Sequence, residues 1–202
     1  MALKGDEADA AGFTLVRLVS GAVTLLAISR FVNSKAKKKG RGNWVSAFFL
    51  FAYAVCFSFA YLSLTTATGA LILFGSVQLT MIVLALLKGE RPGTLEWVGL
   101  AAAVGGLVYL VFPGLSAPPL VSSVLMAAAG ASWGVYTLRG RSSSDPLGET
   151  TGNFVRSVPF VLLIATLFLP NIHLSSRGFV LAVLSGALAS GVGYTVWYAA
   201  LK

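Results

Sequence analysis

The chain has 202 residues, of which 56% are hydrophobic and 11% are charged, and its mean hydropathy is +0.83. A soluble domain carries about 25% charged residues, so this composition excludes an ordinary soluble protein. The net charge of +8 raises nucleic-acid binding as an alternative, but the basic residues gather in one loop without interleaved aromatic residues, which is typical of a segment beside anionic lipid headgroups.

Apolar segments fill nearly the whole chain. A helix needs about 20 apolar residues to cross a hydrocarbon core of about 30 Å, and backbone groups in lipid must form their hydrogen bonds within the segment. We therefore predict an all-α integral membrane protein with seven transmembrane helices and no separate soluble domain. The predicted spans are residues 13–32, 44–64, 67–87, 94–113, 118–138, 153–169 and 178–201.

The distribution of basic residues predicts the orientation of these spans. Residues 1–12 lack the features of a cleavable signal peptide and are expected to form an outer N-terminal segment. If the basic loop after the first span is inside, 11 of the 15 Lys and Arg residues fall in inner segments and only Lys4 and Arg177 in outer ones. The positive-inside rule then places the N-terminus outside and the C-terminus inside.

Two pairs of segments resemble each other across the chain. Residues 13–28 align with residues 152–167, which places Arg17 on Arg156, and AYLSL at 60–64 aligns with WYAAL near the C-terminus. The matching spans are five apart, so the two copies would cross the membrane in opposite directions. Inverted repeats of this kind are the architecture of many secondary transporters, which bind substrate at the repeat interface.

Five motifs, in this order, carry a family resemblance: VRLVSGAVTLL, AYLSLTTATGALILFGSVQLTMIVLALLKGERPG, GLAAAVGGLVYLVFPG, AGASWGVYTLRGR and GVGYTVWYAALK. Together they resemble the EamA-type transporters of the drug/metabolite transporter superfamily, ten-helix proteins made of two inverted five-helix repeats. The resemblance implies helices two to five of the first repeat at 13–113 and helices one to three of the second at 114–202. The first span and the last two would be missing, so we expect a truncated chain.

The same resemblance implies a multi-pass permease or exporter of small metabolites or drug-like solutes, working by alternating access in the cytoplasmic (inner or plasma) membrane. It implies no cofactor and no nucleic-acid partner, and it leaves a homodimer open. The alternative is an inactive fragment or a partner subunit of such a transporter. A seven-helix retinal protein fits less well, because no span interior has a lysine for a Schiff base. A membrane enzyme fits less well too, because the spans lack a catalytic constellation.

Polar and aromatic groups within the spans are the candidates for a substrate pocket. Two arginines lie a few residues inside span ends, where they either snorkel to the headgroups or attract an anionic substrate group. The central glutamine either bonds a neighbouring helix or lines the pocket. Aromatic rings with polar tips either belong to the interfacial belt or suit amphipathic metabolites. The candidates are Arg17, Tyr61, Gln78, Trp133, Tyr136, Arg156 and Tyr194.

Acidic residues are absent from the span interiors, although proton-coupled transporters commonly use an intramembrane carboxylate. Either transport is not driven through such a group, or the group lies in the missing first span. Glu90 and Arg91, in KGERPG, are assigned to a structural turn that ends a helix. His173 has no second ligand nearby, so we expect no metal site.

Small residues recur at four-residue spacing, a pattern that lets membrane helices approach closely. We predict close helix packing at these positions. The pairs are Gly99 with Ala103, Ala102 with Gly106, Gly186 with Ser190, and Ala189 with Gly193.

Overall fold

The protein is all-helical, and no β-strand occurs in the part of the chain that the structure describes. The computed structural model describes Leu3, residues 7–32, 40–90, 93–111, 118–141, 143–194 and Val196. The helices are α1 (Ala10–Val32), α2 (Trp44–Ala60), α3 (Thr66–Leu87), α4 (Thr94–Val111), α5 (Leu120–Gly140), α6 (Pro146–Leu167), the 3-10 helix η3 (Leu169–Asn171), α7 (Ser176–Leu184) and the π-helix η4 (Ser185–Val192), which continues α7.

Four helices, α1, α3, α5 and α6, are long and apolar enough to cross a bilayer, and α2, α4 and α7 with η4 are shorter apolar helices. The prediction of a helical multi-pass membrane protein is therefore confirmed. The sixth helix begins at Pro146, earlier than the predicted residue 153. The reason is a local cap: the Asp145 carboxylate accepts a hydrogen bond of 3.0 Å from the Gly148 backbone N–H, and proline suits the first helical position.

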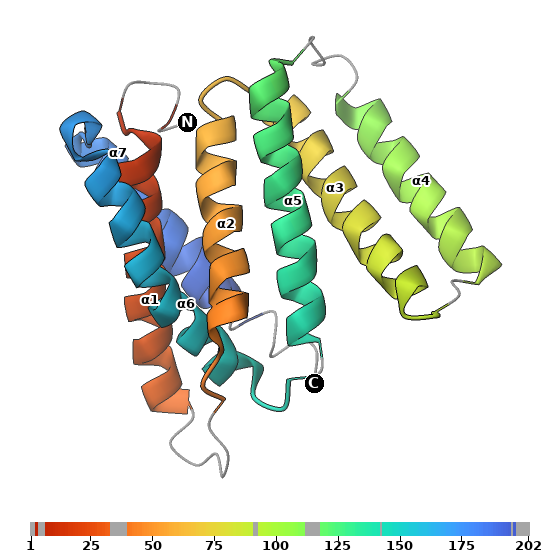
Figure 1. Cartoon of the computed structure of the whole chain (residues 1–202), viewed down its shortest axis with the longest axis horizontal. Coiled ribbons are helices and arrows are strands. Elements are labelled where there is room, and N and C mark those ends of the chain that lie inside the picture. The colour runs from red at the N-terminus through yellow and green to blue at the C-terminus, as the bar shows by residue number, and fades with distance from the viewer. Residues whose placement is uncertain are drawn as a thin grey trace.

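The helices lie side by side and alternate in direction (Figure 1). Helix α1 packs against α2, α6, α7 and η4, α5 packs against α2 and α3, and α4 lies at one edge of the molecule, mainly against α3 (Figure 1). We call the end at which α1 begins the N-terminal end. The opposite end carries Arg41, Lys88, Arg139 and Arg141, and we call it the basic end.

Buried side chains join the helices in two main clusters. One cluster includes Leu25 of α1, Leu50 of α2 and Phe154 of α6, and the other includes Leu73 of α3 and Met126 of α5. Large apolar side chains also cover the outer faces of the bundle, which suits contact with lipid, because lipid tails are as apolar as leucine. Examples are Val23, Leu79 and Leu163, with 60%, 65% and 63% of their surface exposed.

Glycines allow the closest helix contacts. A Cβ added at Gly186 of η4 would lie 2.1 Å from the Arg17 carbonyl oxygen, and one added at Gly130 of α5 would lie 2.6 Å from the Leu73 carbonyl oxygen. The predicted close packing is therefore found at Gly186. It is not found at Gly99 and Gly106, where an added Cβ would meet no described neighbour within 4 Å, because α4 sits at the edge of the bundle (Figure 1).

Candidate functional site

A cavity of about 1190 Å³ lies between α1, α2, α3, α5, α6 and η4. This volume exceeds that of common ligand pockets, which is about 300 to 1,000 Å³. Arg17 lines its deep part, and Arg141, Ser143 and Ser144 line it where α5 connects to α6. The cavity therefore extends from the middle of the bundle to the basic end.

Arg17 lies about 10 Å along α1 from the N-terminal end, at 1.5 Å per residue. Its guanidinium donates a hydrogen bond of 3.2 Å to the Tyr53 hydroxyl. The guanidinium carbon lies 5.6 Å from the centre of the Tyr53 ring and 5.4 Å from that of Phe57, within cation–π range. Both ion pairs among the described residues involve other arginines, Arg141 and Arg177. Arg17 thus enters the cavity without a carboxylate partner among the described residues.

Aromatic rings form much of the cavity wall beside Arg17. The Trp133 ring of α5 lies 5.3 Å from the Tyr53 ring, centre to centre. The Tyr194 ring lies 6.5 Å from the Tyr136 ring and 6.0 Å from the Phe154 ring, with edge-to-face geometry in both pairs. All five of these residues line the cavity, so its wall is suited to a flat or bulky apolar group.

The π-helix η4 forms one side of the cavity through Ala189 and Ser190. Gly186 and Gly191 let it pass close to α1, because an added Cβ would lie 2.1 Å from the Arg17 carbonyl oxygen and 2.7 Å from Thr24 Cγ2, respectively. π-Helical turns are rare and are often found at functional sites. Here the turn brings the backbone of η4 against the segment of α1 that carries Arg17.

Contacts between helices and between chain segments lie at the N-terminal end of the bundle, beyond Arg17. The hydroxyls of Thr14 in α1 and Ser58 in α2 form a buried hydrogen bond of 2.7 Å. The segment before α1 also pairs with the segment before α7, through an antiparallel bridge between Ala8 and Leu174. None of these residues lines the cavity.

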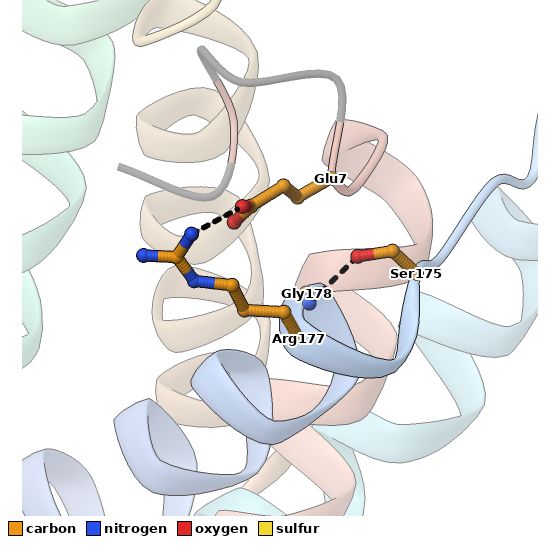
Figure 2. A network of polar contacts seen from close by, with 4 residues as sticks. All are labelled: Glu7, Ser175, Arg177 and Gly178. Carbon is orange, nitrogen blue, oxygen red and sulfur yellow. Dashed lines mark hydrogen bonds and ion pairs between the residues drawn. The ribbon is translucent and has the colours of Figure 1, made fainter.

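An ion pair joins the same two segments. The Glu7 carboxylate and the Arg177 guanidinium are 3.0 Å apart, and they reach toward each other across the start of α7 (Figure 2). The Ser175 hydroxyl accepts a hydrogen bond of 3.0 Å from the Gly178 N–H and so caps α7 (Figure 2). The Asp9 carboxylate accepts a bond of 2.8 Å from the His173 backbone N–H.

A second polar network lies at the basic end, between residues 40–43 and the start of α6. The Asn153 side-chain oxygen accepts a hydrogen bond of 2.8 Å from the Asn43 backbone N–H. Arg156 donates to the backbone oxygens of Arg41 and Gly152, and its guanidinium lies 5.9 Å from the centre of the Trp44 ring. These bonds tie α2 to α6. We call the contacts of Asn153 and Arg156 the basic-end network.

The predicted pocket residues fall into two groups. The structure brings Arg17, Trp133, Tyr136 and Tyr194 together as lining of the cavity, and it does not place Tyr61, Gln78 or Arg156 there. Their roles in substrate binding remain predictions.

Three predicted residues lie outside the cavity for geometric reasons. Tyr61 is buried near the N-terminal end, where its ring lies 4.7 Å from that of Phe57. Gln78 is exposed on α3. Phe74, Val77 and Met81 of α3 line the cavity. At about 100° per residue, Gln78 lies about 40° from Phe74 and about 100° from Val77, so it sits beside this face and is not among the lining residues. Arg156 belongs to the basic-end network.

Tyr53 is one of the cavity residues that the sequence analysis missed, and it is the one that bonds to Arg17. Tyr53, Phe57 and Tyr61 follow each other at four-residue spacing in α2, which places them on one helix face. That aromatic stripe was a usable signal. It marked the face of α2 that meets Arg17, although it could not identify the partner.

The predicted turn after α3 is only partly described. Gly89 has φ of +83°, in the left-handed region that favours glycine, and ends the helix. Glu90 pairs with Arg141 at 3.8 Å, with both side chains exposed, so the turn also contacts the end of α5. Arg91 lies outside the described residues.

Comparison with known proteins places the chain among membrane transporters. A family model described as the EamA-like transporter family matches residues 3–112, more than half of the 202 residues. An uncharacterized protein of Pseudomonas aeruginosa (strain PAO1) is 47% identical over 200 residues, which cover 99% of this chain and 69% of that protein. No solved structure matches the chain. The chain therefore belongs to the EamA-like transporter family, a family of membrane transporters rather than enzymes.

Proposed function

We propose that the protein takes part in moving small metabolites or drug-like solutes across the cytoplasmic membrane by alternating access. The observation that carries this proposal is the cavity of about 1190 Å³, whose lining extends to the basic end, while Thr14, Ala8 and Glu7 join segments at the N-terminal end outside that lining. A site that is accessible from one end at a time is what alternating access requires.

The orientation follows from charge. The positive-inside rule places the basic end in the cytoplasm, so the conformation described here is inward-facing. Opening toward the other side would then require the Ala8–Leu174 bridge and the Glu7–Arg177 ion pair to separate. The ion pair contributes little because the Arg177 side chain is 78% exposed. The bridge is more firmly held, since Ala8 and Leu174 pack in a buried cluster with Phe13 and Ala182, and this cluster would have to separate as well.

We also propose that residues 13–113 and 114–202 belong to two inverted repeats. In the ten-helix pattern of such transporters, three further helices would complete the functional unit. The second candidate is therefore a fragment or partner subunit that needs those helices from elsewhere. The match covers 69% of the relative from P. aeruginosa, so that protein has further sequence outside the match. This difference in length supports the fragment or partner-subunit candidate.

Cysteine accessibility tests the proposed access path. In a Cys56→Ala background, which removes the one native cysteine, Thr137→Cys places a thiol in the cavity wall. A membrane-impermeant maleimide should label it in inside-out vesicles and not in right-side-out vesicles. Leu163→Cys, on an exposed apolar face of α6, is the control and should resist labelling from both sides. Labelling of Thr137→Cys from neither side would contradict the proposal.

Transport itself separates the two candidates. Purified protein in proteoliposomes is tested for uptake of labelled amino acids, sugars, nucleosides and carboxylates. Flux by the 202-residue chain would exclude an inactive fragment. If flux appears only when the part of the relative that lies outside the match is fused or co-expressed, the chain acts as part of a larger transporter.

A further inference from the structure

The described charged side chains that line the cavity are all positive. Of the described residues that line it, Arg17 and Arg141 are cationic and none is Asp or Glu. Arg141 is exposed at the basic end and pairs with Glu90. Arg17 is therefore the charged group in the deep part of the cavity, among aromatic side chains.

Arg17 retains hydrogen-bonding capacity. A guanidinium has five N–H donors in a planar fork, and among the described residues the Tyr53 hydroxyl is the acceptor that the structure gives it, at 3.2 Å. The rings of Tyr53 and Phe57 hold the group by cation–π contact without occupying those donors. A planar carboxylate is the ligand that this fork matches best, since the two can form parallel hydrogen bonds.

Snorkelling does not account for this position. The long side chain could carry the charge toward the N-terminal end of the bundle. Its hydrogen-bond partner Tyr53, however, lies about 10 Å from Ala60, where α2 ends on that side, at 1.5 Å per residue. Closer to that end, the Thr14–Ser58 hydrogen bond joins α1 to α2. The guanidinium is thus held at the depth of the cavity.

We infer that the cavity binds organic anions: a carboxylate on Arg17 and an aromatic or bulky apolar body between Tyr53, Trp133 and Tyr194. The inference rests on the proposed transport function and names its substrate class. An ammonium group would be disfavoured, because no described lining residue is a carboxylate that could pair with it, and an unpaired buried charge is costly. Carboxylates without an amino group should therefore bind better than zwitterions.

Three probes with one ring system test the charge preference: indole-3-acetate, indole-3-acetamide and tryptamine, which are an anion, a neutral molecule and a cation at neutral pH. Their affinities for the purified chain in lipid nanodiscs are measured by isothermal titration calorimetry. We expect indole-3-acetate to bind about tenfold or more tightly than the amide, and tryptamine to bind weakest. Equal or tighter binding of the amide or of tryptamine would overturn the inference, as would no binding of any probe.

Variants of Arg17 test the assigned residue. Arg17→Gln should remove the preference for the anion, and Arg17→Lys should restore part of it, because the charge returns without the planar fork. Arg30→Gln, an exposed residue in the last turn of the same helix, is the matched control and should keep the preference. Unchanged preference in Arg17→Gln would overturn the inference.

The probe-binding test and the cysteine-accessibility test can fail independently of each other. If Thr137→Cys is accessible from inside-out vesicles but the probes show no charge preference, the access path stands and the substrate class is wrong. If the cysteine is inaccessible, the access path fails whatever the probes do. Size-exclusion chromatography of each variant identifies those that do not fold, and the Lys variant then provides the comparison.

Discussion

Arg17 and Arg156 occupy corresponding positions in the two aligned segments of the sequence, yet their surroundings differ. Arg17 faces a cavity and donates to a tyrosine hydroxyl, between two aromatic rings. Arg156 donates to the backbone oxygens of Arg41 and Gly152 and lies near the Trp44 ring. Backbone oxygens are fixed in place, so Arg156 is committed to joining residues 40–43 to α6, whereas the donors of Arg17 remain accessible to a solute.

The alignment between the two segments therefore predicts where an arginine lies but not what it does. The role depends on which acceptors the neighbouring elements supply. Variants near each arginine test this difference. The largest loss of stability is expected where η4 packs against the backbone of Arg17, because there is least room for an added methyl group.

Gly186→Ala should lower the free energy of unfolding by about 3 kcal/mol, because the added methyl would lie 2.1 Å from the Arg17 carbonyl oxygen and overpacking of this kind displaces backbone. Thermal unfolding in detergent measures the loss. Gly99→Ala, with no described neighbour within 4 Å of the added methyl, is the control and should not destabilise the protein. Equal effects of both variants would show that η4 does not pack on α1 in this way.

Asn153→Ala should cost about 1.5 kcal/mol, since the Asn43 backbone N–H would lose its 2.8 Å partner, a part-buried bond to the buried Asn153 side chain. The same thermal measurement detects it. Asn171→Ala, which removes an exposed amide, should leave the melting temperature nearly unchanged. A melting temperature of Asn153→Ala equal to that of the parent would mean that the basic-end network does not stabilise the fold.

Arg156→Gln should cost about 1 kcal/mol through the lost bonds to backbone oxygens, while the affinity for indole-3-acetate stays unchanged. Arg17→Gln should do the reverse, with a small loss of stability and a large loss of affinity. The two variants are compared by thermal unfolding and calorimetry on the same preparations. A fall in affinity with Arg156→Gln would place both arginines in substrate binding.

Arg177→Gln should have the smallest effect, about 0.5 kcal/mol or less, because 78% of the Arg177 side chain is exposed and surface ion pairs contribute little. Glu7→Arg combined with Arg177→Glu should recover any loss, as measured by thermal unfolding. A loss of several kcal/mol would instead mean that the pairing of the two segments at the N-terminal end is essential to the fold.

Local features of the chain determined the helical fold. Long apolar segments, broken by Gly89 and by the polar turn at Asp145, are enough to predict helices that satisfy their own hydrogen bonds in lipid, and the motifs pointed to the family. The helix boundaries were less predictable. The first turns of α6 are polar and are stabilised by the Asp145 cap, so a search for apolar segments places the start of this helix too late.

The site depended on tertiary structure. Trp133, Tyr136 and Tyr194 were chosen because their rings carry polar tips, and they line the cavity. The same criterion also chose Tyr61, which does not, so the pattern could not separate the lining residues from the others. Phe74, Val77 and Met81 of α3 line the cavity, whereas Gln78, four residues after Phe74, does not and is exposed. Only the packing of α3 on α5 decides where the lining of the cavity ends. The sequence by itself therefore determined the helices, the membrane and the family, which follow from local composition. Tertiary packing alone decided which arginine meets the cavity, because that depends on contacts between segments far apart in the chain.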